Sequence, residues 1–365
     1  MMPGEGTSTM PKPHPPVDGS APWTPPPSSA RARRMAAQDL EFNHRDTSTF
    51  LVDVFRSVHG IAENRFEADR CLRPEDVRSM ERSFARTMTS LSGSVPIVGG
   101  RRGRADVSRW VVPVRHGGTL RTAKAYLAIK KKRWILNYFD GCTQISRHAL
   151  ERMYDRTSAA CATRRIMAAL AEWEPVVRWL THAADPETEH AGLMVPTDEG
   201  WLEVGLLAVP PSNGGVVSTD RSGVIRSSFP MACGPEEGGV PTHRVAVVKT
   251  FISVKEPGPK WRLETHRALA AIHREEAATF RDARKAIVEG KDVGVHGELE
   301  RVLTRVSDVH DRTPPRWRAA HVETFRRSAA EVGATPAFDL ELDEPAFKSA
   351  IESGFSTGSR SVYAI

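Results

Sequence analysis

Apolar positions in the first quarter of the chain recur at helical spacing. Between residues 46 and 91 they follow one another at intervals of three and four, which places them on one face of a helix. The first of these apolar residues are Phe50, Leu51, Val54, Phe55 and Val58. Pro74-Glu75-Asp76 has the composition of a helical first turn, with proline early and acids at the positive end of the dipole.

The pattern then changes to strands and returns to helices. Residues 107–114 and 125–129 alternate well enough for two short strands, with Gly117-Gly118 as the turn between them. The apolar run 134–139 fits either element type. Ser146 is a good N-cap for a helix over 147–156, and a second helix is expected over 159–180, with Pro175 starting or kinking its last part.

Three β-rich runs follow, and the chain then becomes helical again. The runs are 193–195, 201–209 and 244–252, and Asp198-Glu199-Gly200 is a tight turn that would join the first two as a hairpin. The Gly-, Ser- and Pro-rich span 210–241 is either a mobile loop or holds a minor strand at Val224-Ile225. Helices are expected over 263–288, over 299–309, and from Pro314-Pro315 to Gly333.

These elements predict an α+β fold. An antiparallel sheet would carry a packed helix that bears His148, with helical segments on its N- and C-terminal sides. The expected division is a disordered Pro-rich segment (1–34), a helical segment (35–95), an α+β domain (96–258), a helical domain (259–335) and an irregular tail (336–365). The first of these contains nine prolines and too little apolar surface to offset the entropy of ordering.

Composition is typical of a soluble globular chain. Of 365 residues, 40% are hydrophobic and 26% charged, and no apolar run approaches the length of a membrane span. The N-terminal sequence lacks an apolar core after a basic start, so we expect no secretory signal, a cytoplasmic location and no membrane partner. The four cysteines form no metal-binding or disulfide pattern and are expected to be free, mostly buried thiols.

Positive charge is concentrated in one stretch. The net charge is +6, yet residues 101–134 contain eleven Lys or Arg against the single acid Asp106. Clustered positive charge favours a polyanion such as nucleic acid, although a solvated surface that aids solubility is the alternative. The candidate nucleic-acid-binding residues are Arg101, Arg102, Arg104, Lys130, Lys131, Lys132, Arg133 and, by stacking on a base, Trp134.

The expected helix 147–156 holds the most informative motif. His148, Arg152 and Arg156 stand at i, i+4 and i+8, so they share one helix face. One imidazole beside two guanidiniums can bind phosphate and transfer a proton near neutral pH. A capping histidine and a solvated arginine stripe are the alternatives. No phosphate loop, dinucleotide fingerprint, zinc-protease motif or hydrolase elbow occurs in the sequence, and we expect no metal or cofactor.

Residues 145–156 resemble the His-Ala-x-x-Arg-(Met)-x-x-Arg helix of a family of small toxin-like domains related to the barnase/colicin/RelE-like ribonuclease assemblage. The resemblance extends over about residues 140–255 and implies an α+β fold with RNA in a cleft between helix and sheet. His148, Arg152 and Arg156 match the motif, and Thr250 stands where the family tends to have a polar residue on the final strand. The long span 210–241 and the large helical flanks depart from the compact family pattern.

The resemblance implies a metal-independent endoribonuclease. His148 would act as general base or acid, Arg152 and Arg156 would stabilise the transition state, and Thr250 or Lys249 would hold a phosphate oxygen. The alternative is a non-catalytic nucleic-acid-binding or protein-interaction protein on the same fold. Exposure of His148, Arg152, Arg156 and Thr250 in one cleft would favour the enzyme. RNA is the expected partner before DNA, and a neutralising protein partner is compatible with the toxin-like resemblance.

Overall fold

The computed structural model describes most of the chain between residues 28 and 317. The described ranges are 28–42, 54, 56–63, 65, 70–90, 93–96, 100–102, 105–116, 119–130, 132–183, 193–209, 212–220, 223–231, 236–237, 240–241, 243–255, 259–289, 296–314 and 317. The expected tail 336–365, most of the helix from Pro314 to Gly333, and residues 1–27 of the expected disordered segment lie outside them.

Within these residues, ten strands form one sheet, which gives the chain an α+β fold as predicted. Seven strands follow the order β1-β3-β4-β5-β12-β7-β6, with β2 beside β3 and the hairpin β8–β9 beside β5. The strands on the N-terminal side are β1 (Val95–Pro96), β2 (Gly100–Arg102), β3 (Ala105–His116), β4 (Thr119–Lys130) and β5 (Arg133–Ile145). The others are β6 (Leu193–Thr197), β7 (Gly200–Val209), β8 (Ser212–Asp220), β9 (Gly223–Met231) and β12 (His243–Ser253), while β10 (Glu236–Glu237) and β11 (Val240–Pro241) pair separately.

Strand β5 joins two halves of the sheet. Its first part, Trp134 to Phe139, pairs with β8, and its last three residues, Thr143 to Ile145, pair with β12 on the same edge. The β5–β12 pairing is parallel, whereas the other strand pairs in the described sheet are antiparallel. The sheet is therefore mixed, which corrects the purely antiparallel expectation.

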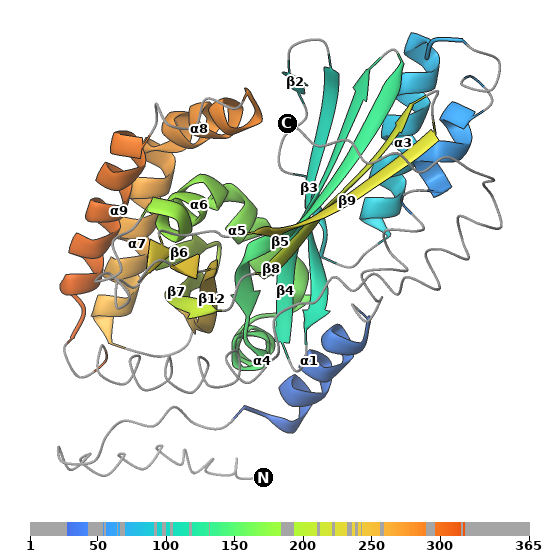
Figure 1. Ribbon diagram of the computed structural model, residues 1–365. Helices are drawn as coiled ribbons and strands as arrows, with labels where there is room; N and C mark the ends of the chain where they lie inside the picture. Colours follow the sequence, from blue (N-terminus) through green and yellow to red (C-terminus); the bar gives the residue numbers. More distant parts are fainter. Residues whose placement is uncertain are drawn as a thin grey trace, which may run out of the picture.

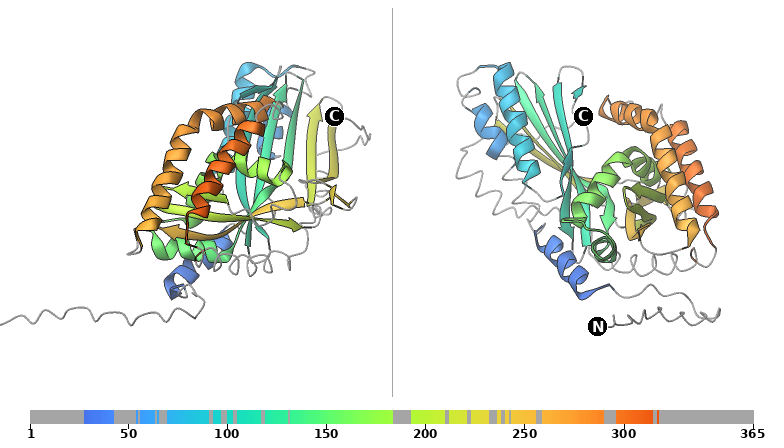
Figure 2. Two further views of the ribbon diagram at one scale, coloured as in Figure 1. Left: turned by 90° about the vertical axis from the view of Figure 1, so that its left-hand side faces the viewer. Right: turned by 180° about the vertical axis from the view of Figure 1, so that it is seen from behind.

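The helices lie on both sides of this sheet (Figure 1). They are α1 (Ala30–Phe42), α3 (Pro74–Thr89), α4 (Arg147–Arg156), α5 (Ala162–Glu172), α6 (Glu174–Ala183), α7 (Lys260–Glu275), α8 (Ala277–Glu289) and α9 (His296–Asp311). Residues 56–63 are also helical. Figure 2 shows α3 and the group α7–α9 on opposite sides of β3–β5.

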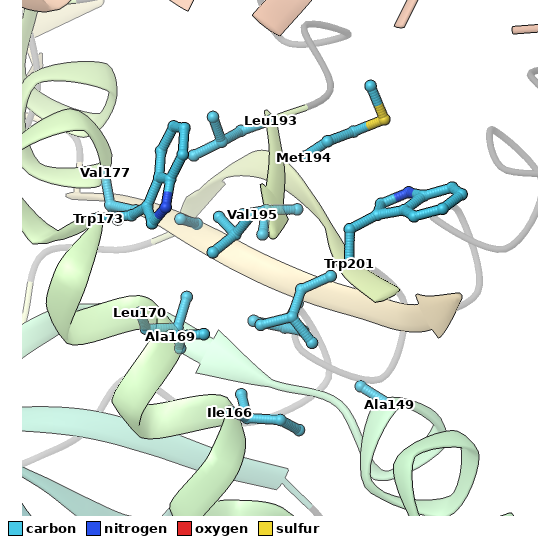
Figure 3. Packing of buried hydrophobic residues seen from close by; sticks show 14 of the residues in the cluster. Ala149, Ile166, Ala169, Leu170, Trp173, Val177, Leu193, Met194, Val195 and Trp201 are labelled. Carbon is cyan, nitrogen blue, oxygen red and sulfur yellow. The ribbon is translucent and has the colours of Figure 1, made fainter. Parts of the chain in front are cut away.

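Two hydrophobic cores hold these layers together. One core packs Met80, Phe84 and Met88 of α3 against one face of β3, β4 and β5. The larger core joins α1, α4, α5 and α6 to β6, β7 and β12, and it includes apolar residues of α7, α8 and α9. Figure 3 shows Leu170 and Val177 of α5 and α6 near Leu193 and Val195 of β6. The C-terminal helices therefore share a core with the sheet.

Local signals predicted several boundaries. Helix α4 begins after Ser146 and ends at Arg156, as expected, and Pro175 is the second residue of α6. The helix expected over 263–288 is two helices, which meet at Glu276. The span 210–241 contains the paired strands β8 and β9, so its structure is more than one minor strand. The last part of the segment expected to be disordered, residues 30–34, forms the start of α1.

Two further findings concern thiols and membranes. Neither Cys71 nor Cys161 is in a disulfide, and Cys71 is exposed and Cys161 half-buried, contrary to the expectation of mostly buried thiols. Among the described residues, no helix is long and apolar enough to cross a bilayer.

Candidate nucleic-acid interface

The start of α4 is tied to strand β12. The Ser146 hydroxyl accepts a hydrogen bond from the Ala149 N–H at 3.1 Å and donates one to the Lys249 carbonyl at 3.0 Å. The Ser146 N–H donates to the Val248 carbonyl at 3.2 Å. One fully buried serine therefore caps the helix and joins it to the sheet.

The other end of α4 is fixed in the same way. The Arg156 Nη1 donates to the Phe251 carbonyl at 2.8 Å, and the Ser253 hydroxyl donates to the Arg156 carbonyl at 3.5 Å. Because its guanidinium binds a backbone carbonyl of β12, Arg156 has a structural contact where the resemblance implied a phosphate contact.

The structure brings His148 and Arg152 together on α4 but does not expose the whole motif. Arg152 Nε lies 3.5 Å from His148 Nε2, to which it donates. His148 is half-buried, whereas Arg152 and Thr250 are only 3% and 4% exposed. Neither buried side chain presents its polar atoms to a ligand in solution.

Helix α1 fixes the outer side of α4 and the start of α5. The Ser29 hydroxyl donates to the Asp155 carboxylate at 2.5 Å, and the Ser29 N–H also donates to it. At the other end of α1, the buried Asp39 carboxylate accepts from the Thr163 N–H at 3.1 Å and from its hydroxyl at 2.7 Å. A segment about 125 residues away in sequence thus holds α4 and α5 in place.

A buried ionisable pair lies near the α4 anchor. Glu203 is 1% exposed and Lys249 is 7% exposed, and Lys249 stands where the β7–β12 register shifts. Burial raises the pKa of Glu203 to about 7, although Lys249 and the Trp201 N–H, which donates to the carboxylate at 2.6 Å, oppose that rise. Burial lowers the pKa of Lys249, opposed by the Glu203 charge. The sequence motif gave no signal of this pair.

Cross-strand register gathers basic residues at one end of the sheet. One row of cross-strand partners runs across four strands. It consists of Arg101 on β2, Asp106 on β3, Ile129 on β4 and Trp134 on β5. The next row contains Arg102 on β2 and the pair Lys130–Arg133 on β4 and β5. Three strand spacings of about 4.8 Å separate β2 from β5, so this row spans roughly 14 Å. We call Arg101, Arg102, Lys130, Lys132 and Arg133 the basic end of the sheet.

The predicted binding residues differ in accessibility. Lys132 is exposed, and Lys130 and Arg133 are half-buried. For Arg101 and Arg102 the structure gives the backbone position in β2, and Arg104 and Lys131 lie outside the described residues. Trp134 is fully buried in the core beneath α3, which corrects its expected role as a stacking platform. Its place opposite Ile129 puts it on the covered face of the sheet.

Helix α8 adds positive charge that the sequence did not indicate. It contacts β2, and Figure 1 places it on the side of the sheet opposite α3. Arg281 and Lys285 of α8 are exposed, and Asp282 between them is exposed as well. Arg284 is half-buried and donates to the Glu172 carbonyl at 2.9 Å. These residues are nearly 180 positions from β2 in sequence, so no local pattern could have placed them there.

The face of β4 and β5 opposite the α3 core is partly open. Residues alternate across a strand, so Tyr126, Ala128 and Lys130 share this face with Arg133 and Ile135 of β5. Tyr126 and Ile135 are half-buried and pack against Ala128 as a small cluster separate from the two cores. We call these five residues the open face.

Helix α6 covers the far part of the same face. Lys124 on β4 pairs with Glu174 at 2.7 Å. Burial would raise the pKa of Glu174, but the charges of Lys124 and Arg109 lower it overall. Lys124 therefore anchors α6, and the open face begins beyond this ion pair.

In the described ranges, no group of three or more His, Cys, Asp or Glu residues is arranged to hold a metal ion. No protein-family model, curated protein sequence or solved structure matches this chain. The toxin-like resemblance of residues 140–255 therefore stays a prediction.

Proposed function

We propose that this protein binds nucleic acid through the basic end of its sheet. The observation that carries the proposal is the register of β2–β3–β4–β5, which places Arg101, Arg102, Lys130 and Arg133 along one sheet end. Exposed Lys132 lies in the turn between β4 and β5, and α8, which contacts β2, carries exposed Arg281 and Lys285 together with exposed Asp282.

Electrostatics supports a polyanion as the partner of this surface. Positive side chains that contact phosphates release condensed counterions, which gives affinity independent of sequence. Across the described residues, the structure gives no ion pair for Lys130, Lys132 or Arg133 with a carboxylate. The five basic residues outnumber the two carboxylates that the register puts at this end, Asp106 of β3 and Asp220 of β8.

The contacts of α4 favour binding over cleavage. Arg156 is engaged with the Phe251 carbonyl, and Arg152 and Thr250 are buried. For α4 to act on a ribose phosphate, Arg152 and Thr250 would first have to become accessible. We therefore propose the non-catalytic alternative, with α4 as the scaffold that joins β12 to α1.

The binding proposal is tested with fluorescein-labelled 20-mer RNA and DNA of one mixed sequence, measured by fluorescence anisotropy. The test variant carries Lys130→Ala, Lys132→Ala and Arg133→Ala. The control carries Arg78→Ala, Arg82→Ala and Arg86→Ala, which remove the same charge from exposed positions on α3. We expect the test variant to bind about tenfold more weakly or worse, a loss of about 1.4 kcal/mol, and the control to bind like wild type. Equal affinity of both variants would refute the proposed surface.

Cleavage is tested on the same RNA in EDTA, with wild type beside His148→Ala. We expect both proteins to leave the RNA intact. Products with 2′,3′-cyclic phosphate ends that appear with wild type and disappear with His148→Ala would instead support the ribonuclease hypothesis.

A further inference from the structure

The open face combines positive charge with an aromatic residue. Lys130 and Arg133 are cross-strand partners at its end, and Tyr126 lies on the same face four residues along β4. Four residues of strand span about 13 Å. Positive charge and a half-buried aromatic side chain therefore lie within a distance that a few nucleotides cover.

The partial burial of this face indicates a contact surface and not a core. Leu127, Ile129, Trp134 and Leu136 point to the opposite side and are at most 1% exposed. Tyr126 and Ile135 remain half-buried on a face with its own small cluster. Helix α6 begins at Glu174, which pairs with Lys124, and Figure 1 shows the ends of β3–β5 near β2 projecting beyond α5 and α6.

A duplex and a single strand would use such a face differently. The bases of a duplex are stacked on one another, so their faces cannot reach a tyrosine ring. An unpaired base can stack on an aromatic side chain while its phosphates meet basic residues, as on the sheets and barrels that bind single strands.

We propose, on the basis of the function proposed above, that the open face binds unpaired nucleotides, with Tyr126 stacking on a base and Lys130 and Arg133 contacting the flanking phosphates. Ile135 supplies an apolar contact beside the ring. Stacking tolerates any base, so this site selects single strands over duplexes without selecting a sequence.

The first test compares a labelled 12-mer RNA, free or annealed to its complement, with wild type, Tyr126→Phe and Tyr126→Ala. A single DNA strand of the same sequence is the parallel arm. We expect Tyr126→Ala to weaken single-strand binding by about 5- to 150-fold, the range for removal of one base stack. Tyr126→Phe retains the ring and should bind like wild type, and duplex binding should be unchanged in both variants. Unchanged single-strand affinity of Tyr126→Ala would overturn the proposal.

The second test needs no variant. Wild type is photo-crosslinked to a 12-mer containing 5-iodouridine, digested with trypsin and mapped by mass spectrometry. The tryptic peptide 125–130 contains Tyr126 as its aromatic residue, and peptide 153–156, with half-buried Tyr154, is the internal control. Crosslinks at Tyr126 are expected, and crosslinks confined to other peptides would contradict the proposal.

The two proposals fail in different ways. If wild type binds single strands and duplexes equally well, and Tyr126→Ala changes neither, the basic end binds nucleic acid but the open face does not read unpaired bases. If wild type binds neither form at low salt, both proposals are wrong.

Discussion

The Ser146 hydroxyl tests most sharply whether α4 is anchored to β12. It accepts from the Ala149 N–H and donates to the Lys249 carbonyl, and the residue is fully buried. Ser146→Ala removes both hydrogen bonds. Loss of an N-cap costs about 1 kcal/mol, and a buried carbonyl left without its partner costs about 1–3 kcal/mol. The expected loss in the free energy of unfolding is therefore about 2–4 kcal/mol.

This loss is measured by urea unfolding followed by circular dichroism, with the slope against urea unchanged. Ser90→Ala is the control, because the Ser90 hydroxyl also donates to a carbonyl, that of Thr87 at 2.8 Å, but at an exposed position after α3. We expect less than about 0.5 kcal/mol there. A loss of that size in Ser146→Ala as well would refute the view that α4 is anchored to β12 through this residue.

Three further predictions follow from buried polar contacts. Asp39→Ala removes both hydrogen bonds to Thr163 and should lower the free energy of unfolding by about 2–4 kcal/mol. Trypsin should then cleave faster at exposed Arg33 and Arg34 of α1. An unchanged rate of digestion would contradict the view that Asp39 holds α1 against α5. Arg156→Met removes the bond to the Phe251 carbonyl and should lower stability by about 1.5–3 kcal/mol in urea unfolding while leaving RNA affinity unchanged; weaker RNA binding by a stably folded variant would give Arg156 a ligand role. Burial raises the pKa of Glu203 from 4.5 to about 7, so this carboxyl takes up a proton on folding between these pH values. The stability that the bound proton contributes is fully present below pH 4.5. It is lost as the pH rises through 7. Glu203→Gln should remove that part of the pH dependence, and identical pH profiles of the two proteins would show that Glu203 has the same pKa in the folded and unfolded protein.

Local chemistry made part of the fold predictable. Ser146 followed by strong helix formers specifies the start of α4, and Pro175 limits where α5 can continue. The turn Asp198-Glu199-Gly200 specifies the β6–β7 hairpin, where Gly200 has φ 158° and a Cβ would meet the Ile252 carbonyl. In these places a few neighbouring residues carry the signal.

Non-local pairing decided the rest. The Gly- and Ser-rich residues of β8 have weak strand preference, and their structure depends on pairing with β5 about 80 positions earlier. Trp134 begins a run without alternation, so its covered face is set by α3 and not by its own sequence. The contact of α8 with β2, which enlarges the candidate site, likewise depends on two segments far apart in the chain.

The salt dependence of binding tests the central claim most directly. For a single-stranded 20-mer, the logarithm of the association constant is plotted against the logarithm of the salt concentration for wild type, the Lys130/Lys132/Arg133 alanine variant and the Arg78/Arg82/Arg86 alanine control. If these three side chains of the basic end bind phosphates, the slope should become shallower by about 2 in the first variant, because each neutralised phosphate of a single strand contributes about 0.7 to the slope. The control should keep the wild-type slope. Three parallel lines would contradict the account, because the nucleic acid would then not bind at the basic end of the sheet.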